Sequence, residues 1–332
     1  MPSPEFNFES VPKNIPYSAV CDVLQRHHEL VDSIEPITSG TLNLSYKLFD
    51  GSEVWGVAKL HNPNKPLEHV CFENDFCSSL VLGGLPTPKL VRTRDKSEYA
   101  VTDLGIITVH IFCEGLNYSF RDEEIEGAAR MQARMHEVPL EKLAQTYPEQ
   151  DFFDNPKFLV SKVEEVLRSG VNSHGNLERG LNYLSKRRKP NTMALGSKRA
   201  IHADYHPWNL KFDKNGNVCA IFDYDFVMPG RKLYDLAISL IYFGRDKSKG
   251  EFREDVANRN IRRYLGGYKE IGNLSMEELR ELPFLVLVRC LDNLRRDLKR
   301  KDSKHKLTFS NLRNLAVLNW AMNLDMNGGI IT

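Results

Sequence analysis

The spacing of apolar residues divides the chain into two parts with different secondary structure. Val20, Val23 and Leu24 recur at helical spacing and predict a helix over residues 17–31. Beyond it, short apolar stretches bounded by turn residues predict β-strands. These strands cover 34–38, 44–49, 53–60, 89–94, 99–102 and 106–112, with a helix between the third and the fourth that ends at Leu85-Pro86.

From residue 123 onward, apolar residues follow the helical period almost throughout. A strand-rich part followed by a mainly helical part predicts an α+β fold with two lobes. A chain of 332 residues is long enough for two such lobes. The predicted helices of the second part cover 125–136, 152–167, 177–184, 233–243, 251–268, 276–282, 283–300 and 307–326.

Composition narrows the class of protein. The formal net charge of +1 gives no reason to expect a nucleic acid, a membrane surface or a polycation as partner. The N-terminus lacks the apolar core of a signal peptide, and no apolar run is long enough to span a membrane. The six cysteines include no C-x-x-C pair, so we expect reduced, mostly buried thiols in a cytoplasmic protein.

Candidate chemistry concentrates between residues 200 and 240. Asp204 and Asn209 lie five residues apart on one predicted loop, and a hairpin through the apolar run 218–222 then returns the chain to Asp223. Transfer of a nucleotide γ-phosphoryl group needs Mg²⁺ held by a carboxylate and an amide oxygen, and a second carboxylate that orients the acceptor hydroxyl. We interpret Asp204 as the catalytic base and Asn209 and Asp223 as metal ligands. The alternative, a solvated hairpin with turn-forming Asp and Asn residues, explains the turn at Asn215 but not this spacing.

Lys59 lies in the apolar strand sequence V-A-K-L. Burying an ammonium group without a partner is costly, so a buried Lys59 requires a carboxylate nearby. The alternative is a solvated strand face, which Lys59 would share with Trp55 and Val57.

Three motifs of the central segment resemble the aminoglycoside phosphotransferase and choline kinase-like superfamily, including its homoserine kinase type II-like small-molecule kinases. They are H-A-D-Y-H-P-W-N, I-F-D-Y-D and L-Y-D-L-A, and the wider resemblance covers about residues 33–245. It implies a protein-kinase-like two-lobed fold, with a small antiparallel-sheet lobe over 1–112 and a mainly helical lobe over 113–332. Asp204 would be the catalytic residue, and Asn209 and Asp223 would be the magnesium ligands. His202 and Asp235 would support the catalytic loop.

Two positions point to the small-molecule branch of this superfamily. Ala203 and Asp225 stand where protein kinases usually carry Arg and Gly. Asp225 could face the acceptor or cap a turn, and both interpretations stay open. His136 is expected to be structural, because no cluster of metal ligands surrounds it in the sequence.

The resemblance also assigns nucleotide-binding residues in the first lobe. The stretch G-T-L-N-L-S-Y is similar to the first hairpin of homoserine kinase-like members, so Ser39, Gly40, Thr41 and Asn43 would surround the phosphates. A turn with one glycine is by itself a weak phosphate-loop signal, and an ordinary hairpin is the alternative.

The remaining nucleotide contacts follow from the same resemblance. Lys59 would reach the α- and β-phosphates and pair with Glu73, or failing that with Glu68. Backbone groups from Ile111 to Cys113 would bind the adenine edge.

Together these features predict an ATP- and Mg²⁺-dependent kinase of a small hydroxylated metabolite, such as an amino alcohol, a sugar or an amino acid. An aminoglycoside is disfavoured, because the segment from Arg289 to Lys304 is basic and does not suit a polycation. These cations could meet an anionic substrate, but a solvated helix face is the preferred explanation. A protein Ser/Thr kinase and a non-catalytic nucleotide-binding scaffold are the other candidate classes, although a scaffold has no need of the full set of predicted site residues.

Overall fold

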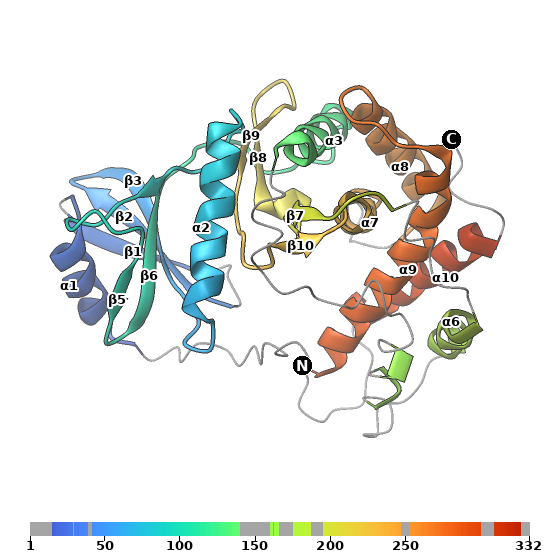
Figure 1. The fold of residues 1–332 in the computed structure, drawn as a ribbon, viewed down its shortest axis with the longest axis horizontal. Helices are drawn as coiled ribbons and strands as arrows, with labels where there is room; N and C mark the ends of the chain where they lie inside the picture. The colour runs from blue at the N-terminus through green and yellow to red at the C-terminus, as the bar shows by residue number, and fades with distance from the viewer. Residues whose placement is uncertain are drawn as a thin grey trace. The chain divides into compact units, whose positions relative to one another are not determined.

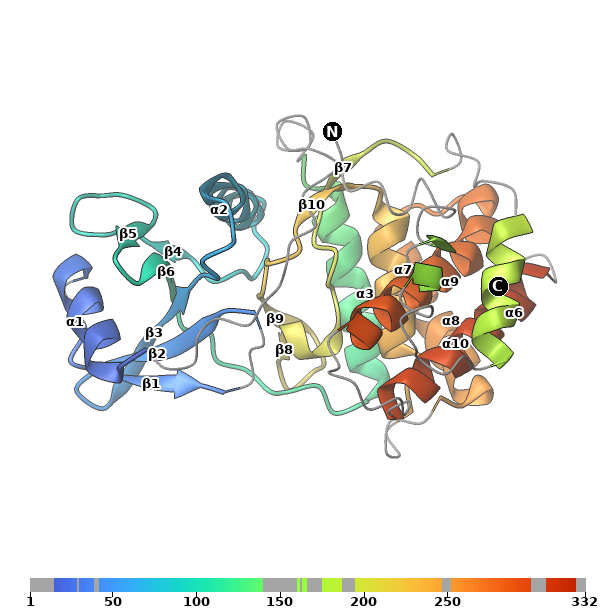
Figure 2. The ribbon, with the colours of Figure 1, turned by 90° about the horizontal axis from the view of Figure 1, so that it is seen from below.

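The chain forms two compact units in the computed structural model. The first comprises the described residues of Met1–Gly115 together with Cys219–Asp225, and the second those of Leu116–Val218 and Phe226–Thr332. The structure describes residues 15–28, 30–38, 42–139, 160–161, 163–165, 175–186, 195–246, 252–299 and 309–326. The first unit carries the large antiparallel sheet and two helices, and the second is mainly helical, in agreement with the predicted α+β fold (Figures 1 and 2).

The first unit is built on an antiparallel sheet with the strand order β1-β2-β3-β6-β4. The strand β5 pairs with the N-terminal part of β6. The turn between β2 and β3 passes through Gly51, whose φ of +58° is a left-handed conformation that glycine adopts at low cost. The strands are β1 (Ser33–Ile37), β2 (Leu44–Asp50), β3 (Glu53–Leu60), β4 (Leu90–Val91), β5 (Ala100–Thr102) and β6 (Gly105–Ile111).

Two helices accompany this sheet, α1 (Tyr17–His27) and α2 (Leu67–Leu82), and Figure 1 shows the sheet between them. Val23 and Leu24 of α1 pack in one buried cluster with strand residues that include Leu48 and Leu60. Because side chains alternate across a strand, the residue before Leu60 points to the opposite face of the sheet. That residue is Lys59.

The segment Cys219–Asp225 joins the first unit, although we expected everything after residue 113 in the second part. Its backbone accounts for this: the N–H of Ile221 donates to the carbonyl of Pro86 at 2.8 Å. The hydroxyl of Tyr224 also donates to Thr87 at 3.1 Å, and its ring lies 5.4 Å from that of Phe76. These contacts tie the segment to α2 and to the residues that follow it.

The second unit is mainly helical, with α3 packed on α8 and α9 packed on α10. Within this unit, the short strand β7 (Arg199–Ile201) pairs with β10 (Met228–Gly230). The predicted hairpin also forms, with β8 (Leu210–Phe212) paired to β9 (Val218–Ile221). The helices are α3 (Asp122–Glu137), α6 (Gly175–Lys186), α7 (Lys232–Phe243), α8 (Glu254–Lys269), α9 (Met276–Lys299) and α10 (Phe309–Met326).

Three predictions of secondary structure need correction. The strand expected over 89–94 contains only Leu90–Val91, and the pair β7 and β10 was not predicted because three-residue strands leave no readable pattern. The helices expected over 276–282 and 283–300 form the single helix α9, which continues through Pro283. Burial of the apolar residues from Phe284 onward outweighs the backbone hydrogen bond that proline removes. Most of the helix expected over 152–167 lies outside the described residues.

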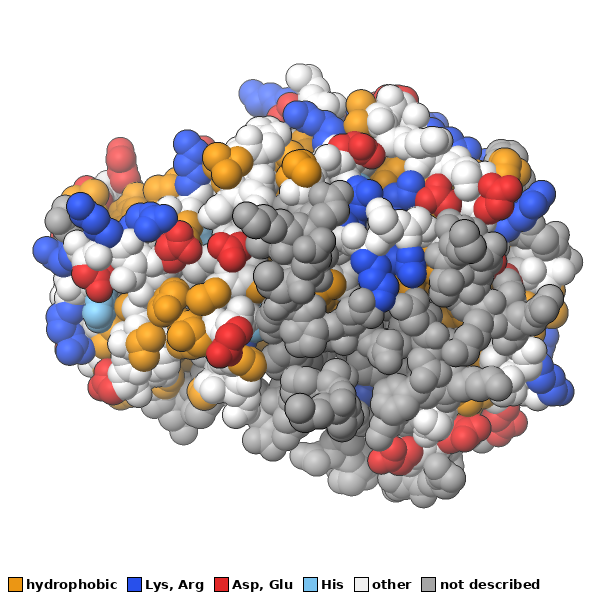
Figure 3. Space-filling view, in the orientation of Figure 1, with side chains coloured by type: hydrophobic (Ala, Val, Ile, Leu, Met, Phe, Trp, Pro, Cys, Tyr) orange, Lys and Arg blue, Asp and Glu red, His pale blue; other side chains and the backbone are white. Residues whose placement is uncertain are grey.

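The cysteines and the surface complete this picture. All six cysteines are free, but only Cys77 and Cys290 are buried, so the expectation of mostly buried thiols is wrong. Among the described residues, no helix combines the length and the apolar character that crossing a membrane requires. On the face drawn in Figure 3, cationic and anionic side chains are interspersed, as the small net charge suggests.

Candidate active site

Lys59 lies in an ion pair inside the first unit. Its Nζ is 2.8 Å from Oδ1 of Asp225 and 3.5 Å from Oδ1 of Asp223. Its side chain is 19% exposed, which rules out the solvated strand face considered above. Burial opposes the charge, but the neighbouring carboxylates, Asp225 first, outweigh it and raise the pKa of Lys59. The ammonium group is therefore charged at every physiological pH.

A second buried lysine, Lys65, forms the ion pair that we expected Lys59 to form. Its ammonium group contacts the carboxylate of Glu73, and it lies 2.7 Å from Oδ1 of Asp225. The prediction that Lys59 pairs with Glu73 is thus wrong, since Glu73 pairs with Lys65; the second choice, Glu68, is exposed. The reason is local: Lys65 lies in the connection between β3 and α2, just before the first turn of the helix that carries Glu73.

Asp225 is the centre of this network. Its Oδ1 accepts from both lysines, its Oδ2 accepts from the amide of Asn43, and its backbone carbonyl accepts from His69 at 3.0 Å. Burial disfavours its charge, yet Lys59 and Lys65 hold its pKa well below the usual range. Asp225 is therefore neither an acceptor contact nor a turn cap but the shared counter-ion of two lysines.

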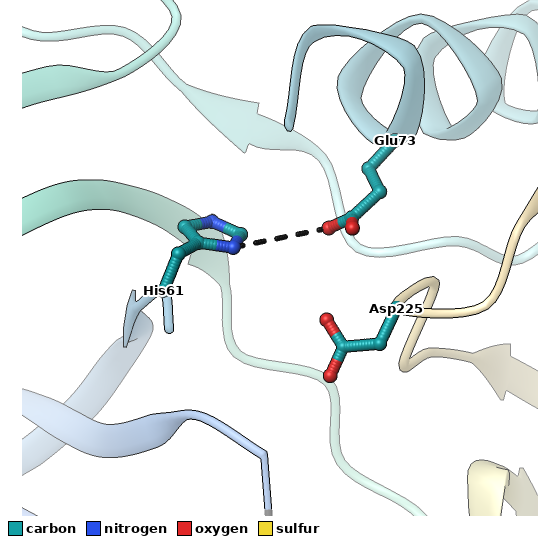
Figure 4. Close-up of side chains that lie close together, drawn as sticks. All are labelled: His61, Glu73 and Asp225. Atoms are coloured by element: carbon teal, nitrogen blue, oxygen red, sulfur yellow. Dashed lines mark ion pairs between the residues drawn. The ribbon is translucent and has the colours of Figure 1, made fainter. Parts of the chain in front are cut away.

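His61, Glu73 and Asp225 come close enough to hold a metal ion, as Figure 4 shows. Nδ1 of His61 lies 4.0 Å from Oε2 of Glu73. However, the ammonium group of Lys65 contacts both carboxylates and already supplies the positive charge that a metal would bring. Burial lowers the pKa of His61 to about 3, so this histidine is neutral and adds no charge to the group. We interpret the group as an ion network without a metal.

The predicted phosphate turn is described only in part. Ser39, Gly40 and Thr41 lie outside the described residues. Asn43 is buried, and besides its bond to Asp225 its Oδ1 accepts from the N–H of Asn62 at 2.9 Å. In this structure Asn43 ties the start of β2 to the ion network.

The predicted adenine-binding segment follows β6. The N–H of Ile111 donates to Lys89 and that of Phe112 to Trp55, both at 2.9 Å. Within the described part of the chain, the Cys113 amide has no hydrogen-bond partner. Of the predicted backbone donors, the N–H of Cys113 is therefore the one that is available to a ligand.

In the second unit, Asp204 and Asn209 share one loop, as predicted. Nδ2 of Asn209 donates to the backbone carbonyl of Asp204 at 3.1 Å and approaches its Oδ2 at 3.4 Å. Asn209 ends a short 3₁₀ turn, Pro207–Asn209, that leads into β8. This turn and the hydrogen bonds fix the two side chains relative to each other.

Asp235 braces the loop from the first turn of α7. Its carboxylate accepts the backbone N–H of His202 at 3.0 Å and that of Ala203. It also contacts Nε2 of His136 at 3.2 Å, while Nδ1 of His136 lies 2.8 Å from the hydroxyl of Tyr268. His136 is structural, as expected, and His202 contributes its backbone.

Ala203 and Asp223 both have left-handed backbones, with φ of +58° and +69°. Such conformations cost residues with a side chain about 1–2 kcal/mol and often mark functional positions. Ala203 directly precedes the predicted catalytic residue Asp204, and Asp223 is itself a predicted metal ligand. The two bonds from Asp235 hold the first of these strained turns in place.

Two side chains to which the sequence analysis gave no role lie beside Asp204. His206 Nε2 is 3.4 Å from Oδ2, and Arg289 Nη2 is 3.7 Å from Oδ1. Burial raises the pKa of Asp204, but hydrogen bonding and charge from His206, with Arg289 in support, lower it to about 2. Asp204 is therefore ionised at neutral pH.

The preferred explanation of the basic residues on α9 is wrong for two of them. Arg289 and Arg295 are both buried, and both contact Asp292, at 3.6 and 2.9 Å. Cations on a helix have the same spacing whether their face is solvated or packs charged pairs, so the sequence could not separate the two.

A sequence model of the APH phosphotransferase enzyme family matches residues 33–272. The chain belongs to this family. It is a phosphotransferase, and the resemblance read from the motifs around Asp204 and Asp223 is confirmed. A comparison with curated proteins finds no match.

Solved structures show the same fold over nearly the whole chain. An amicoumacin kinase in complex with AMP-PNP, Ca²⁺ and Ami is 15% identical, with a TM-score of 0.66 and 94% of each chain covered. A spectinomycin phosphotransferase with ADP and spectinomycin is 15% identical at a TM-score of 0.66, covering 95% of this chain and 98% of its own. A microcompartment-associated aminopropanol kinase is 15% identical at a TM-score of 0.62, covering 95% and 99%. The predicted protein-kinase-like fold is thus confirmed.

Proposed function

We propose that the protein transfers the γ-phosphoryl group of ATP to a hydroxyl group of a small metabolite, of the amino alcohol, sugar or amino acid type. The observation that carries this proposal is the loop on which Asp204 and Asn209 are hydrogen-bonded while Asp235 holds the backbone behind them. Similar structures were solved with AMP-PNP and with ADP, which supports ATP as the donor.

Asp204 is the proposed catalytic base. As an ionised carboxylate it accepts the hydrogen bond of the acceptor hydroxyl and orients that oxygen toward the γ-phosphorus. Because phosphoryl transfer passes through a loose and highly charged transition state, positioning and charge neutralisation supply most of the rate enhancement.

The predicted metal ligands suit Mg²⁺ by their chemistry. Asp223, in the first unit, has a carboxylate that is 42% exposed. Asn209, in the second unit, uses its Nδ2 within the loop, which leaves the amide oxygen for a hard cation. Bound Mg²⁺ would neutralise charge on the β- and γ-phosphates. Asp225 is not assigned as a ligand, because two ammonium groups occupy it.

Lys59 is the proposed phosphate contact of the first unit. The ammonium group of Lys59 is charged. Because Lys65 pairs with Glu73, this glutamate does not need Lys59 as its partner. Ser39, Gly40, Thr41, Ile111 and Cys113 remain proposed nucleotide contacts on the resemblance alone. A cytoplasmic location also remains a proposal, supported by six free cysteines.

The experiment that tests the function measures ADP formation from ATP with a pooled library of amino alcohols, sugars, amino acids, nucleosides and aminoglycosides, with Mg²⁺ and with excess chelator. The expected result is Mg²⁺-dependent ADP release that needs one acceptor class. Transfer of labelled phosphate to added proteins instead of to the library would support a protein kinase. No ATP binding under any condition would overturn the proposal.

A further inference from the structure

Aromatic side chains gather beside the catalytic carboxylate of the second unit. The ring of His206, whose Nε2 contacts Asp204, lies 4.8 Å from that of Tyr242. Trp208 lies 5.6 Å from His206 and 5.9 Å from Tyr242, in both cases edge to face. Its indole is nevertheless 53% exposed. A large, rigid apolar surface held open next to a catalytic residue is the kind of surface that binds a ligand.

A buried arginine lies over these rings. The Cζ atom of Arg245 is 4.0 Å from the ring centre of Tyr242 and 5.5 Å from that of Trp208. Arg245 is 6% exposed, its Nε has no hydrogen-bond partner, and no carboxylate among the described residues pairs with it. Burial lowers its pKa to about 10, which still leaves it charged at neutral pH. Among the described residues, only the aromatic rings and a hydrogen bond with the side chain of Tyr242 compensate this buried cation, so an anion would stabilise it further.

The charges around Arg245 favour an anion as well. Arg313 adds repulsion to it, and Arg289 brings a second buried guanidinium group to Oδ1 of Asp204. The thiol of Cys290 lies within electrostatic range of both Arg245 and Arg289, and burial raises its pKa to about 12, so it is neutral. Asp204 and Asp292 offset the charge of Arg289, whereas no carboxylate among the described residues pairs with Arg245.

We propose that this group, Arg245, Trp208, Tyr242 and Arg289, is an acceptor subsite for a hydroxylated metabolite that carries a carboxylate or phosphate group. The oxyanion binds the guanidinium group of Arg245, whose planar fork matches either group. The carbon skeleton lies on the exposed indole of Trp208, and a hydroxyl group faces Asp204. This assignment rests on the proposed function and narrows its substrate class: a polycationic acceptor would meet like charge.

Matched acceptors test the assignment. The set is glycerol, glycerate and glycerol phosphate, and a hexose with its uronic acid and its phosphate ester, each assayed for kcat/KM with saturating Mg²⁺-ATP. At least one anionic acceptor should exceed its neutral parent by tenfold or more. Comparing the carboxylated acceptors with the phosphorylated ones shows which of the two anionic groups the subsite binds. Equal kcat/KM for neutral and anionic acceptors would overturn the subsite and leave the kinase function standing.

Substitutions locate the effect. Arg245→Met should raise the KM for the anionic acceptor at least tenfold and leave the KM for ATP unchanged, while Arg245→Lys should restore part of the affinity. Arg263→Met is the matched control, because Arg263 pairs with Asp122 and Glu126 away from the aromatic group. An unchanged acceptor KM in folded Arg245→Met would contradict the proposal. Absence of ADP formation with every acceptor would instead reject the proposed function itself.

A binding measurement needs no acceptor. Inorganic phosphate, titrated at constant ionic strength, should change the tryptophan fluorescence, since Trp208 is exposed whereas Trp55 is half-buried and Trp320 is buried. The change should disappear in Trp208→Phe and need at least tenfold more phosphate in Arg245→Met. A response that persists in both variants would show binding elsewhere and overturn the subsite.

Discussion

The ammonium group of Lys65 contacts the carboxylate of Glu73 in the interior of the first unit, where both side chains are only 6% exposed. The same ammonium group lies 2.7 Å from Asp225. One lysine thus joins α2 to the segment Cys219–Asp225, which carries the predicted metal ligand Asp223. The position of that ligand depends on a side chain outside the recognised motifs.

Replacing Lys65 by Met should destabilise the first unit by about 3–5 kcal/mol, because it leaves two buried carboxylates with too little compensation. Urea unfolding, followed by the change in midpoint, measures the effect. Lys47→Met is the matched control: Lys47 pairs with Glu35 at 3.6 Å on the surface, and such pairs are worth less than about 1 kcal/mol. Equal effects of the two substitutions would contradict the buried network.

His28 should make stability depend on pH. Burial, then the charges of His27 and Arg94, lower its pKa from 6.5 to about 4. Between these values the unfolded chain binds more protons than the folded one, so stability present above pH 6.5 is lost as the pH falls toward 4. His28→Gln should remove a loss on the order of 2 kcal/mol from this window. The same slope in mutant and wild type would exclude His28 as its source.

Gly127 of α3 should not tolerate a methyl group. A Cβ at this position would overlap the carbonyl oxygen of Gly216, in the turn between β8 and β9. Gly127→Ala should therefore destabilise the second unit, although alanine ordinarily stabilises a helix by up to about 1 kcal/mol. Gly266→Ala in α8 is the matched control, since a Cβ there meets nothing within 4 Å. Thermal unfolding should move down for the first variant and slightly up for the second.

Asp235→Asn should slow turnover without weakening the binding of ATP. The N–H groups of His202 and Ala203 donate to different oxygens of Asp235, and an amide would put an NH2 donor in place of one of them, so the left-handed turn before Asp204 loses part of its support. We expect kcat to fall about 10–100-fold, the usual effect of removing a residue that orients a catalytic group. The check is kcat and the KM for ATP with the acceptor found in the library screen. A rise in KM alone would assign Asp235 a different role.

The sequence predicted the features that depend on neighbours along the chain. The loop with Asp204 and Asn209, the hairpin that leads to Asp223 and most helices were readable, because each follows from short-range spacing. The bracing by Asp235 was readable only through the resemblance.

Other features depend on contacts between distant segments. Burial of Lys65 against Asp225, 160 residues away, leaves no mark in the pattern around Lys65. Arg289 and Arg295 looked like surface cations because a helix gives the same spacing whichever face is buried. Pro283 looked like a helix boundary because the apolar packing that carries α9 through it is tertiary.

The central claim, that Asp204 is the catalytic base of an ATP-dependent phosphotransferase, is tested most directly by one substitution. Asp204→Asn keeps the size of the side chain and removes the carboxylate, and Asp213→Asn in the exposed hairpin turn is the control. We predict that turnover falls by about 10³-fold or more in the first variant, with ATP affinity unchanged and the control equal to wild type. Turnover of Asp204→Asn within tenfold of wild type would contradict the account.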